Sequence, residues 1–165
     1  MKKRKRKENY SKFVKNKIDN KLIRIHKETS IEKKIRLLLQ SCKIPFIQEF
    51  KLKNKYFDFL IFDYINEDIQ IPVCIIEVNG DYFHAREYII EQKKPYTKLT
   101  KIQKRNVQND KKKKFIAQEY KFPIIHIWET DIKKDMKCVK KQLMSFLKEV
   151  YGKIPSLNKS EIDFQ

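Results

Sequence analysis

Two apolar segments that each carry a single acid constrain this chain most strongly. Residues 57–62 contain Asp58, and residues 75–79 contain Glu77. Short apolar runs of this kind are typical of buried β-strands, and a buried carboxylate costs several kcal/mol unless it is paired or binds a cation. Two such acids on successive strands predict a shared cation. Hard divalent ions such as Mg²⁺ prefer carboxylate oxygens, with water and phosphate completing the shell, so we expect a metal-dependent phosphodiesterase site.

The charge of the chain favours a polyanionic partner. Lys and Arg total 39 against 21 Asp and Glu, which gives a formal net charge of +18. Such an excess is typical of nucleic-acid-binding proteins, although the many lysines, isoleucines and asparagines also fit a lysine-rich proteome. No run approaches ~18 uninterrupted apolar residues, so no membrane association is expected. Three scattered cysteines and the absence of a signal peptide favour a cytoplasmic protein, or a nuclear one in a eukaryotic or viral setting.

The chain divides into three predicted regions. Residues 1–28 form a basic N-terminal arm, residues 29–151 a single domain, and residues 152–165 a C-terminal tail. The arm opens with a run of like charges of the kind that contacts DNA, and the same run could act as a nuclear localisation signal. The cations of this run assigned to DNA binding are Lys2, Lys3, Arg4, Lys5 and Arg6.

Within the domain, the apolar periodicity predicts the order helix, three strands, helix, strand, helix. The helices are expected from the capping box at residues 29–32, over 101–120 and over 132–150; the strands are expected at 45–50, 56–62, 71–78 and 122–128; residues 85–100 are expected to be a loop. This order indicates a small α/β domain with one mixed sheet flanked by helices. The lysine-rich helix over 101–120 carries Lys104 and Arg105, which we assign to DNA binding.

Two candidate site residues also have a purely structural interpretation. Glu32 completes a capping box with Thr29, or it faces a site from the flank of the apolar stripe. Asp110 lies at the edge of the apolar face of its helix, where an acid is commonly solvated and balanced by neighbouring lysines.

These residues carry a resemblance to the very short patch repair (Vsr) endonucleases, a branch of the PD-(D/E)xK nuclease superfamily. Glu32 stands in the place of the glutamate of the family's first helix, and Phe57-Asp58-Phe59 is similar to its Pro-Asp-Phe motif. Residues 75–84 resemble the strand and turn that end in Gly-x-aromatic-aromatic-His. Residues 101–110 and 124–129 resemble the Asn-Val-x-x-Asp helix and the apolar-Trp-Glu strand. The resemblance implies a restriction-endonuclease-like fold, and homing endonucleases with a Vsr-like domain share the same residue set.

The resemblance also implies roles for the acids. Asp58 would be the principal ligand of Mg²⁺, for which Mn²⁺ can substitute. The backbone carbonyl of Val78 would complete the set of metal ligands that the protein provides. Glu77 matches the second acid of the wider superfamily and would bind the metal directly or through water. Glu32 would hold a metal-bound water or a ligand from outside the first coordination sphere.

His84 would be the general base that activates water, and Asp110 would orient it or support its charged form. Histidine suits this role because imidazole titrates near neutral pH. Tyr82 and Phe83 match aromatic positions that wedge between base pairs in Vsr enzymes; the alternative is that both rings pack under the turn in the core.

Departures from the family pattern limit what can be transferred. Asn79 replaces the histidine of Vsr and the lysine of ExK enzymes, which leaves His84 as the general base. No structural zinc is expected, because Arg86 and Thr130 stand among residues that replace the family's zinc-binding segment. His126 alternates within a buried strand and is interpreted as structural.

We therefore predict a Mg²⁺-dependent endodeoxyribonuclease that acts on DNA, most simply double-stranded DNA. Nicking in mismatch repair and cutting in homing or restriction are both compatible with the motif set. Two alternatives stay open: a catalytically silent DNA-binding module, and a structure-specific nuclease acting on RNA or branched DNA.

Overall fold

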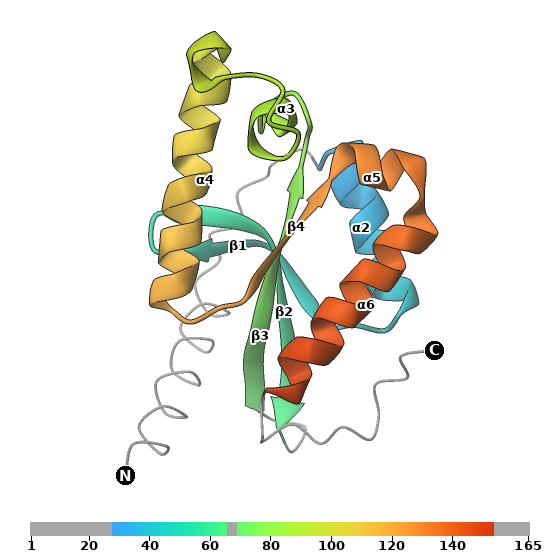
Figure 1. The fold of residues 1–165 in the computed structure, drawn as a ribbon. Coiled ribbons are helices and arrows are strands. Elements are labelled where there is room, and N and C mark those ends of the chain that lie inside the picture. The colour runs from blue at the N-terminus through green and yellow to red at the C-terminus, as the bar shows by residue number, and fades with distance from the viewer. Residues whose placement is uncertain (1–27, 66–68, 154–165) are drawn as a thin grey trace.

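The computed structural model describes residues 28–65 and 69–153, which form a small α/β domain with a four-stranded mixed sheet (Figure 1). The predicted basic run from Lys2 to Arg6, the rest of the arm to residue 27, and the tail from residue 154 lie outside the described residues. The elements in chain order are α2 (Ser30–Ser41), β1 (Phe46–Leu52), β2 (Lys55–Ile65), β3 (Ile69–Asn79), α3 (Arg86–Ile89), the 3-10 helix η1 (Tyr96–Lys98), α4 (Lys101–Glu119), β4 (Ile124–Trp128), α5 (Glu129–Lys134) and α6 (Met136–Gly152). None of the described helices is long and apolar enough to cross a bilayer.

The strands lie in the order β1-β2-β3-β4, with antiparallel pairing between the first three strands and parallel pairing between β3 and β4. A parallel pair needs a long crossover connection, and here α3, η1 and α4 supply it. Because the two strands run in the same direction, the ends of β3 and β4 meet at one edge of the sheet. This edge carries the turn after Asn79 and the start of α5.

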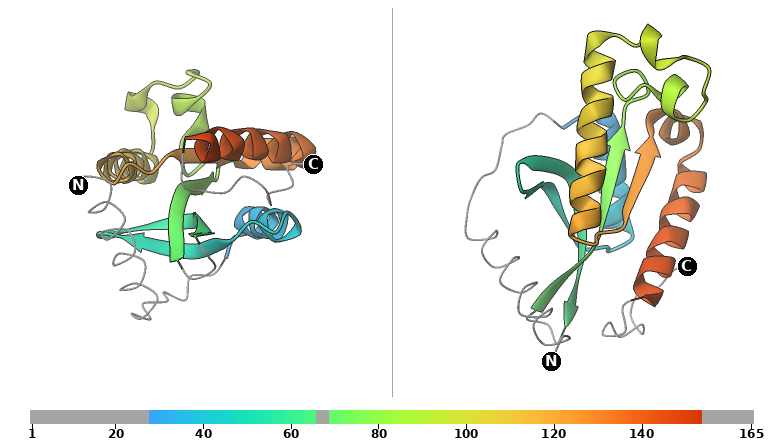
Figure 2. Two further views of the ribbon diagram at one scale, coloured as in Figure 1. Left: turned by 90° about the horizontal axis from the view of Figure 1, so that it is seen from below. Right: turned by 60° about the vertical axis from the view of Figure 1, so that its left-hand side comes forward.

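Helices on either side bury two apolar clusters against the sheet. Side chains of α2, α5 and α6 form the larger cluster, in which Ile35, Leu39, Ile76 and Leu143 are fully buried. Side chains of α4, Ile116 among them, form the smaller cluster against β1, β2 and β3. Figure 2 shows α4 and α6 on either side of the β3–β4 pair. The predicted mixed sheet flanked by helices is therefore confirmed.

The expected C-terminal helix over 132–150 is wrong in one respect, because the segment forms two helices, α5 and α6. The chain is extended at Asp135 (φ −158°, ψ 98°), whose carboxylate accepts hydrogen bonds from the N–H groups of Lys137 and Cys138. An aspartate at this position satisfies backbone donors that a new helix would otherwise leave unpaired. Asp135 therefore ends one helix and starts the next.

The expected loop over 85–100 also needs correction, since it contains the short helices α3 and η1. On α4, Ile102 is exposed and Val107 is buried. Val107 packs with Ala85 and Leu99 in a third small cluster. This cluster fixes the segment after β3 against the first half of α4.

Candidate active site

Asp58 and Glu77 lie on adjacent strands and are joined by hydrogen bonds across the β2–β3 pair. The Asp58 N–H donates to Glu77 Oε1 at 3.3 Å, and the Val78 N–H donates to Asp58 Oδ2 at 2.7 Å. Each carboxylate therefore accepts a bond from the backbone of the other strand. The prediction that the two acids come together is confirmed, and the backbone of Val78 lies against Asp58.

Both carboxylates are held in an environment that disfavours their charged forms. Glu77 is only 2% exposed, and burial together with the nearby charge of Asp58 raises the pKa of Glu77 to about 8. Burial is also the main cause that raises the pKa of Asp58 to about 6, with smaller contributions from Glu32 and Glu49. Burying two adjacent acids lowers the stability of the fold, because their charged forms are disfavoured. Proteins keep such an arrangement mainly at functional sites.

Lys113 is a member of the site that the sequence interpretation missed. Its Nζ lies 2.6 Å from Glu77 Oε2, and its side chain is 13% exposed. Burial alone would lower the pKa of Lys113, but the charges of Glu77 and Asp58 outweigh this and raise it. Lys113 therefore carries a positive charge beside the acids. The available signal was its position three residues after Asp110, which places both side chains on one face of α4.

His84 and Asp110 form the second half of the site. His84 Nδ1 lies 2.7 Å from Asp110 Oδ2, and both side chains are largely buried. The interpretation of Asp110 as a solvated acid balanced by surface lysines is thus wrong. Its charge also acts on Glu77 and Lys113, whose pKa values it raises. The histidine–carboxylate pair and the buried acids therefore belong to one electrostatic neighbourhood.

The turn that delivers His84 presents two aromatic rings to solvent. Tyr82 and Phe83 are 57% and 55% exposed, with their rings edge to face at a centroid distance of 5.4 Å. Two side chains of α4 hold the backbone under them: Gln103 Nε2 donates to the Tyr82 carbonyl at 2.8 Å, and Asn106 Nδ2 donates to the Phe83 carbonyl at 3.0 Å. The core-packing alternative for these rings is wrong.

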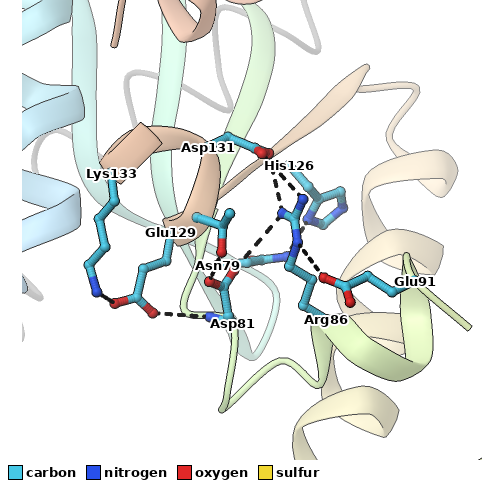
Figure 3. A network of polar contacts seen from close by, with 9 residues as sticks. Asn79, Asp81, Arg86, Glu91, His126, Glu129, Asp131 and Lys133 are labelled. Atoms are coloured by element: carbon cyan, nitrogen blue, oxygen red, sulfur yellow. Dashed lines mark hydrogen bonds and ion pairs between the residues drawn. The ribbon is translucent and has the colours of Figure 1, made fainter. Parts of the chain in front are cut away.

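Arg86 connects this turn to the start of α5 (Figure 3). Its guanidinium lies 3.2 Å from Asp131 Oδ1, 3.5 Å from Glu91 Oε1 and 3.9 Å from Asp81 Oδ1. Its Cζ also lies 5.4 Å from the ring centroid of Trp128. Since these partners come from both sides of the parallel β3–β4 edge, Arg86 holds the segment after His84 against the sheet.

Two further contacts fasten the same turn. The Asp81 N–H donates to Glu129 Oε2 at 3.2 Å, and the Thr130 hydroxyl donates to the Asp81 carboxylate. Arg86 and Thr130 thus take part in a network of charged and polar side chains.

Of the two interpretations of Glu32, the structure shows the capping box with Thr29. Its Oε2 accepts from the Thr29 N–H at 3.0 Å, and its own N–H donates to Thr29 Oγ1 at 3.3 Å, so the predicted capping box is present. Its charge still reaches the site, because it contributes to the raised pKa of Asp58. The capping contacts do not prevent an electrostatic role.

Asn79 and His126 form another pair that the sequence did not indicate. They lie on neighbouring strands, with Asn79 Nδ2 at 3.3 Å from His126 Nδ1. Burial lowers the pKa of His126, and the charges of Asp110 and His84 also act on it. His126 therefore lies close to the candidate site.

The two α4 cations assigned to DNA binding have different surroundings. Lys104 is half-buried: its Nζ donates to the Thr97 carbonyl at 3.3 Å and lies over the Tyr96 ring. Arg105 is exposed. Lys104 thus fastens the segment before α4, and Arg105 is the better placed of the two to meet a partner.

The donor set fits a hard divalent cation. Within residues 28–65 and 69–153, no group of three or more His, Cys, Asp or Glu side chains is placed to hold a metal ion. Mg²⁺ commonly takes only one or two carboxylates and completes its shell with water and phosphate. Burial is the main cause that raises the pKa values of Asp58 and Glu77, and the charge of Lys113 offsets it only in part. A cation at the two acids would relieve that imbalance.

Comparison with known proteins gives no family assignment. No protein-family model matches the chain, and neither a curated protein nor a solved structure is significantly similar to it.

Proposed function

We propose that this protein is a metal-dependent DNA endonuclease with a Vsr-like, restriction-endonuclease-like fold. The observation that carries the proposal is the pairing of Asp58 with Glu77 across two strands, beside the hydrogen-bonded His84 and Asp110. The buried Glu77 and the half-buried Asp58 would supply metal ligands, and a histidine fixed by a carboxylate would supply a base. Acting together, a metal ion and a general base hydrolyse phosphodiesters at neutral pH.

Asp58 and Glu77 would hold Mg²⁺ or Mn²⁺, with the Val78 carbonyl as a further oxygen ligand. When bound, the metal stabilises negative charge on the phosphate oxygens and on the departing 3′ oxygen. Glu77 Oε2 is paired with Lys113 at 2.6 Å, so Oε1, which faces the Asp58 N–H, is the oxygen that would meet the metal directly or through water. Glu32 contributes negative charge near Asp58 and strengthens the preference for a cation.

His84 would accept the proton of the attacking water through Nε2, because its Nδ1 faces Asp110. Asp110 fixes the ring orientation and stabilises the imidazolium that forms when the proton is taken. Lys113 adds a fixed positive charge where negative charge builds up on the phosphate. These three side chains assemble because α4 crosses over the turn after β3.

DNA is the proposed partner because the chain carries a formal net charge of +18. Tyr82 and Phe83 stand exposed immediately before His84, where inserted rings would unstack base pairs beside the cleaved phosphate. Arg105 and the basic run from Lys2 to Arg6 would contact the phosphate backbone of DNA.

A silent DNA-binding module is the second candidate, and Lys113 is the observation that favours it. Its ammonium already neutralises Glu77, so the domain does not require a metal to compensate both acids. In that case the fold and the charge serve binding alone.

Cleavage of supercoiled plasmid in Mg²⁺ or Mn²⁺ separates the two candidates. The wild type should nick or linearise the plasmid, and its cleavage should stop when EDTA is added. His84→Ala should still bind DNA in a gel shift and should cleave it at least about 100-fold more slowly. Lys148→Ala, which changes an exposed lysine of α6, serves as the control for loss of a surface side chain outside the candidate site. Binding without cleavage of plasmid, mismatched or branched DNA by the wild type would favour the silent module.

A further inference from the structure

A basic groove lies between α4 and the turn that joins β1 to β2. It consists of two hollows of about 360 and 410 Å³ that share Lys55, Gln108 and Lys112 in their linings. The side chains on which the inference rests are Lys55, Arg105, Lys111, Lys112 and Phe115. We call this surface the α4 groove. Among the described residues that line it there are four cations and no acid, so it is complementary to a polyanion.

The α4 groove contains an exposed aromatic ring. Phe115 is 67% exposed, the highest value among the large apolar side chains of the described residues. It sits among lysines in the lining of the first hollow. Proteins that bind single strands combine a basic groove with aromatic rings on which bases stack. A duplex offers its phosphates to such a surface but keeps its base faces covered.

The α4 groove begins next to the proposed catalytic turn. Asn106 lines the second hollow, and its side-chain amide donates to the carbonyl of Phe83, the residue before His84. From Asn106 to Phe115, α4 rises about 14 Å at 1.5 Å per residue. That length corresponds to roughly four nucleotides at the 3.4 Å spacing of a strand stacked as in a duplex, and to fewer nucleotides of an extended strand. Nine residues at 3.6 per turn also carry the lining half-way round α4, so a strand leaving the site would cross the helix obliquely, from the hollow at Asn106 to the hollow at Phe115.

We propose that the α4 groove binds an unpaired DNA strand next to the cleaved phosphate, with a base stacked on Phe115 and phosphates on Lys55, Arg105, Lys111 and Lys112. This rests on the proposed endonuclease function and specifies its substrate as DNA in which a single-stranded segment adjoins a duplex. Tyr82 and Phe83 lie at the point where the strands would part.

Fluorescence anisotropy with labelled oligonucleotides tests the proposal. The full chain is titrated in EDTA, which prevents cleavage, against a paired duplex and against the same duplex with a gap of unpaired nucleotides. The wild type should bind the gapped DNA more tightly. Phe115→Ala should lose roughly 5- to 150-fold in affinity for the gapped DNA and keep its affinity for the duplex, whereas Phe115→Trp should retain both.

Two lysine variants separate the groove from general charge. Lys112→Ala should weaken binding to both DNAs and reduce the slope of log K against log salt by about 1. Lys148→Ala on α6, at the far side of the domain from α4 in Figure 1, should change binding less. The proposal is overturned by equal affinity of the wild type for the two DNAs, by a gap preference that survives Phe115→Ala, or by equal effects of the two lysine variants.

These outcomes are distinct from failure of the endonuclease proposal. Loss of gap preference in Phe115→Ala together with no cleavage of gapped DNA by the wild type would support the α4 groove and refute the nuclease. Cleavage of gapped and paired DNA at one rate, unaffected by Phe115→Ala, would support the nuclease and refute the α4 groove.

Discussion

Replacing Asp58 by asparagine should stabilise the protein when no metal is present, although it removes the principal proposed metal ligand. Asp58 is half-buried beside the buried Glu77, and its Oδ2 accepts a hydrogen bond from the Val78 N–H at 2.7 Å. Asparagine has nearly the same shape, and its side-chain oxygen can accept the same bond. The change therefore removes one buried charge and leaves the packing in place.

The magnitude follows from the pKa of Asp58, which burial raises from 3.8 to about 6. A carboxyl group with a higher pKa in the folded state holds its proton more tightly there than in the unfolded chain. The folded state consequently loses stability as pH rises from the unfolded pKa through the folded one. The shift corresponds to about 3 kcal/mol at neutral pH and above. Asparagine is neutral at every pH, so the variant escapes this loss.

Thermal unfolding in EDTA measures the effect. The Asp58→Asn variant should unfold about 6–12 °C above the wild type near pH 8, and the gain should vanish near pH 4, where Asp58 is protonated in the wild type. Added Mg²⁺ should raise the midpoint of the wild type and leave that of the variant unchanged. A variant that is less stable than the wild type near pH 8, or equally stabilised at both pH values, would refute the assigned cost of the buried charge.

Three further substitutions probe the surroundings of the site. Lys113→Met should destabilise the protein in EDTA by about 3–5 kcal/mol, because Glu77 loses its partner. Urea unfolding measures this loss, and Mg²⁺ should restore part of it. An unchanged unfolding midpoint would contradict the ion pair. Asp110→Asn should slow plasmid cleavage by about 10- to 100-fold with little change in DNA affinity, and an equal loss of both would instead indicate a role in binding. Arg86→Ala should slow cleavage and speed amide hydrogen exchange in the turn after β3. Exchange at the wild-type rate would exclude Arg86 as the residue that holds this turn.

The strands and their acids were predictable because the physical signal is local. A run of apolar side chains interrupted by Asp58 or Glu77 needs a reason for each acid, and the two strands follow each other in the chain, so antiparallel pairing brings the acids together. The capping box at Thr29 and Glu32 is likewise a property of four successive residues. The fold class followed from the order of such local signals.

The site residues that α4 contributes could not be predicted from local sequence signals. Lys113 is one of four consecutive lysines, residues 111–114, and only its place over the sheet distinguishes it from the others. Asp110 is likewise surrounded by lysines in the sequence, which favours a solvated acid, and only the fold places it beside His84. The apolar face of α4 is weak, with Ile102 exposed and Val107 buried against Ala85 and Leu99. The orientation of this helix therefore depends on tertiary contacts.

Two other differences have distinct causes. Periodicity alone does not reveal that Asp135 prefers to cap α6 over continuing a helix from α5, because a polar residue fits either interpretation. Tyr82 and Phe83 were open between core and surface, since large aromatic residues are commonly buried. Their exposure follows from Gln103 and Asn106, which bind the backbone of the turn from below.

Electron paramagnetic resonance of Mn²⁺ titrated into the protein tests most directly whether the buried acids form a metal site. The account predicts that the wild type binds a single Mn²⁺ and that Asp58→Asn, folded and more stable, does not. Lys148→Ala on the remote helix α6 should bind Mn²⁺ as the wild type does. Failure of the wild type to bind Mn²⁺, or equal binding by Asp58→Asn, would contradict the metal site and with it the proposed metal-dependent hydrolysis.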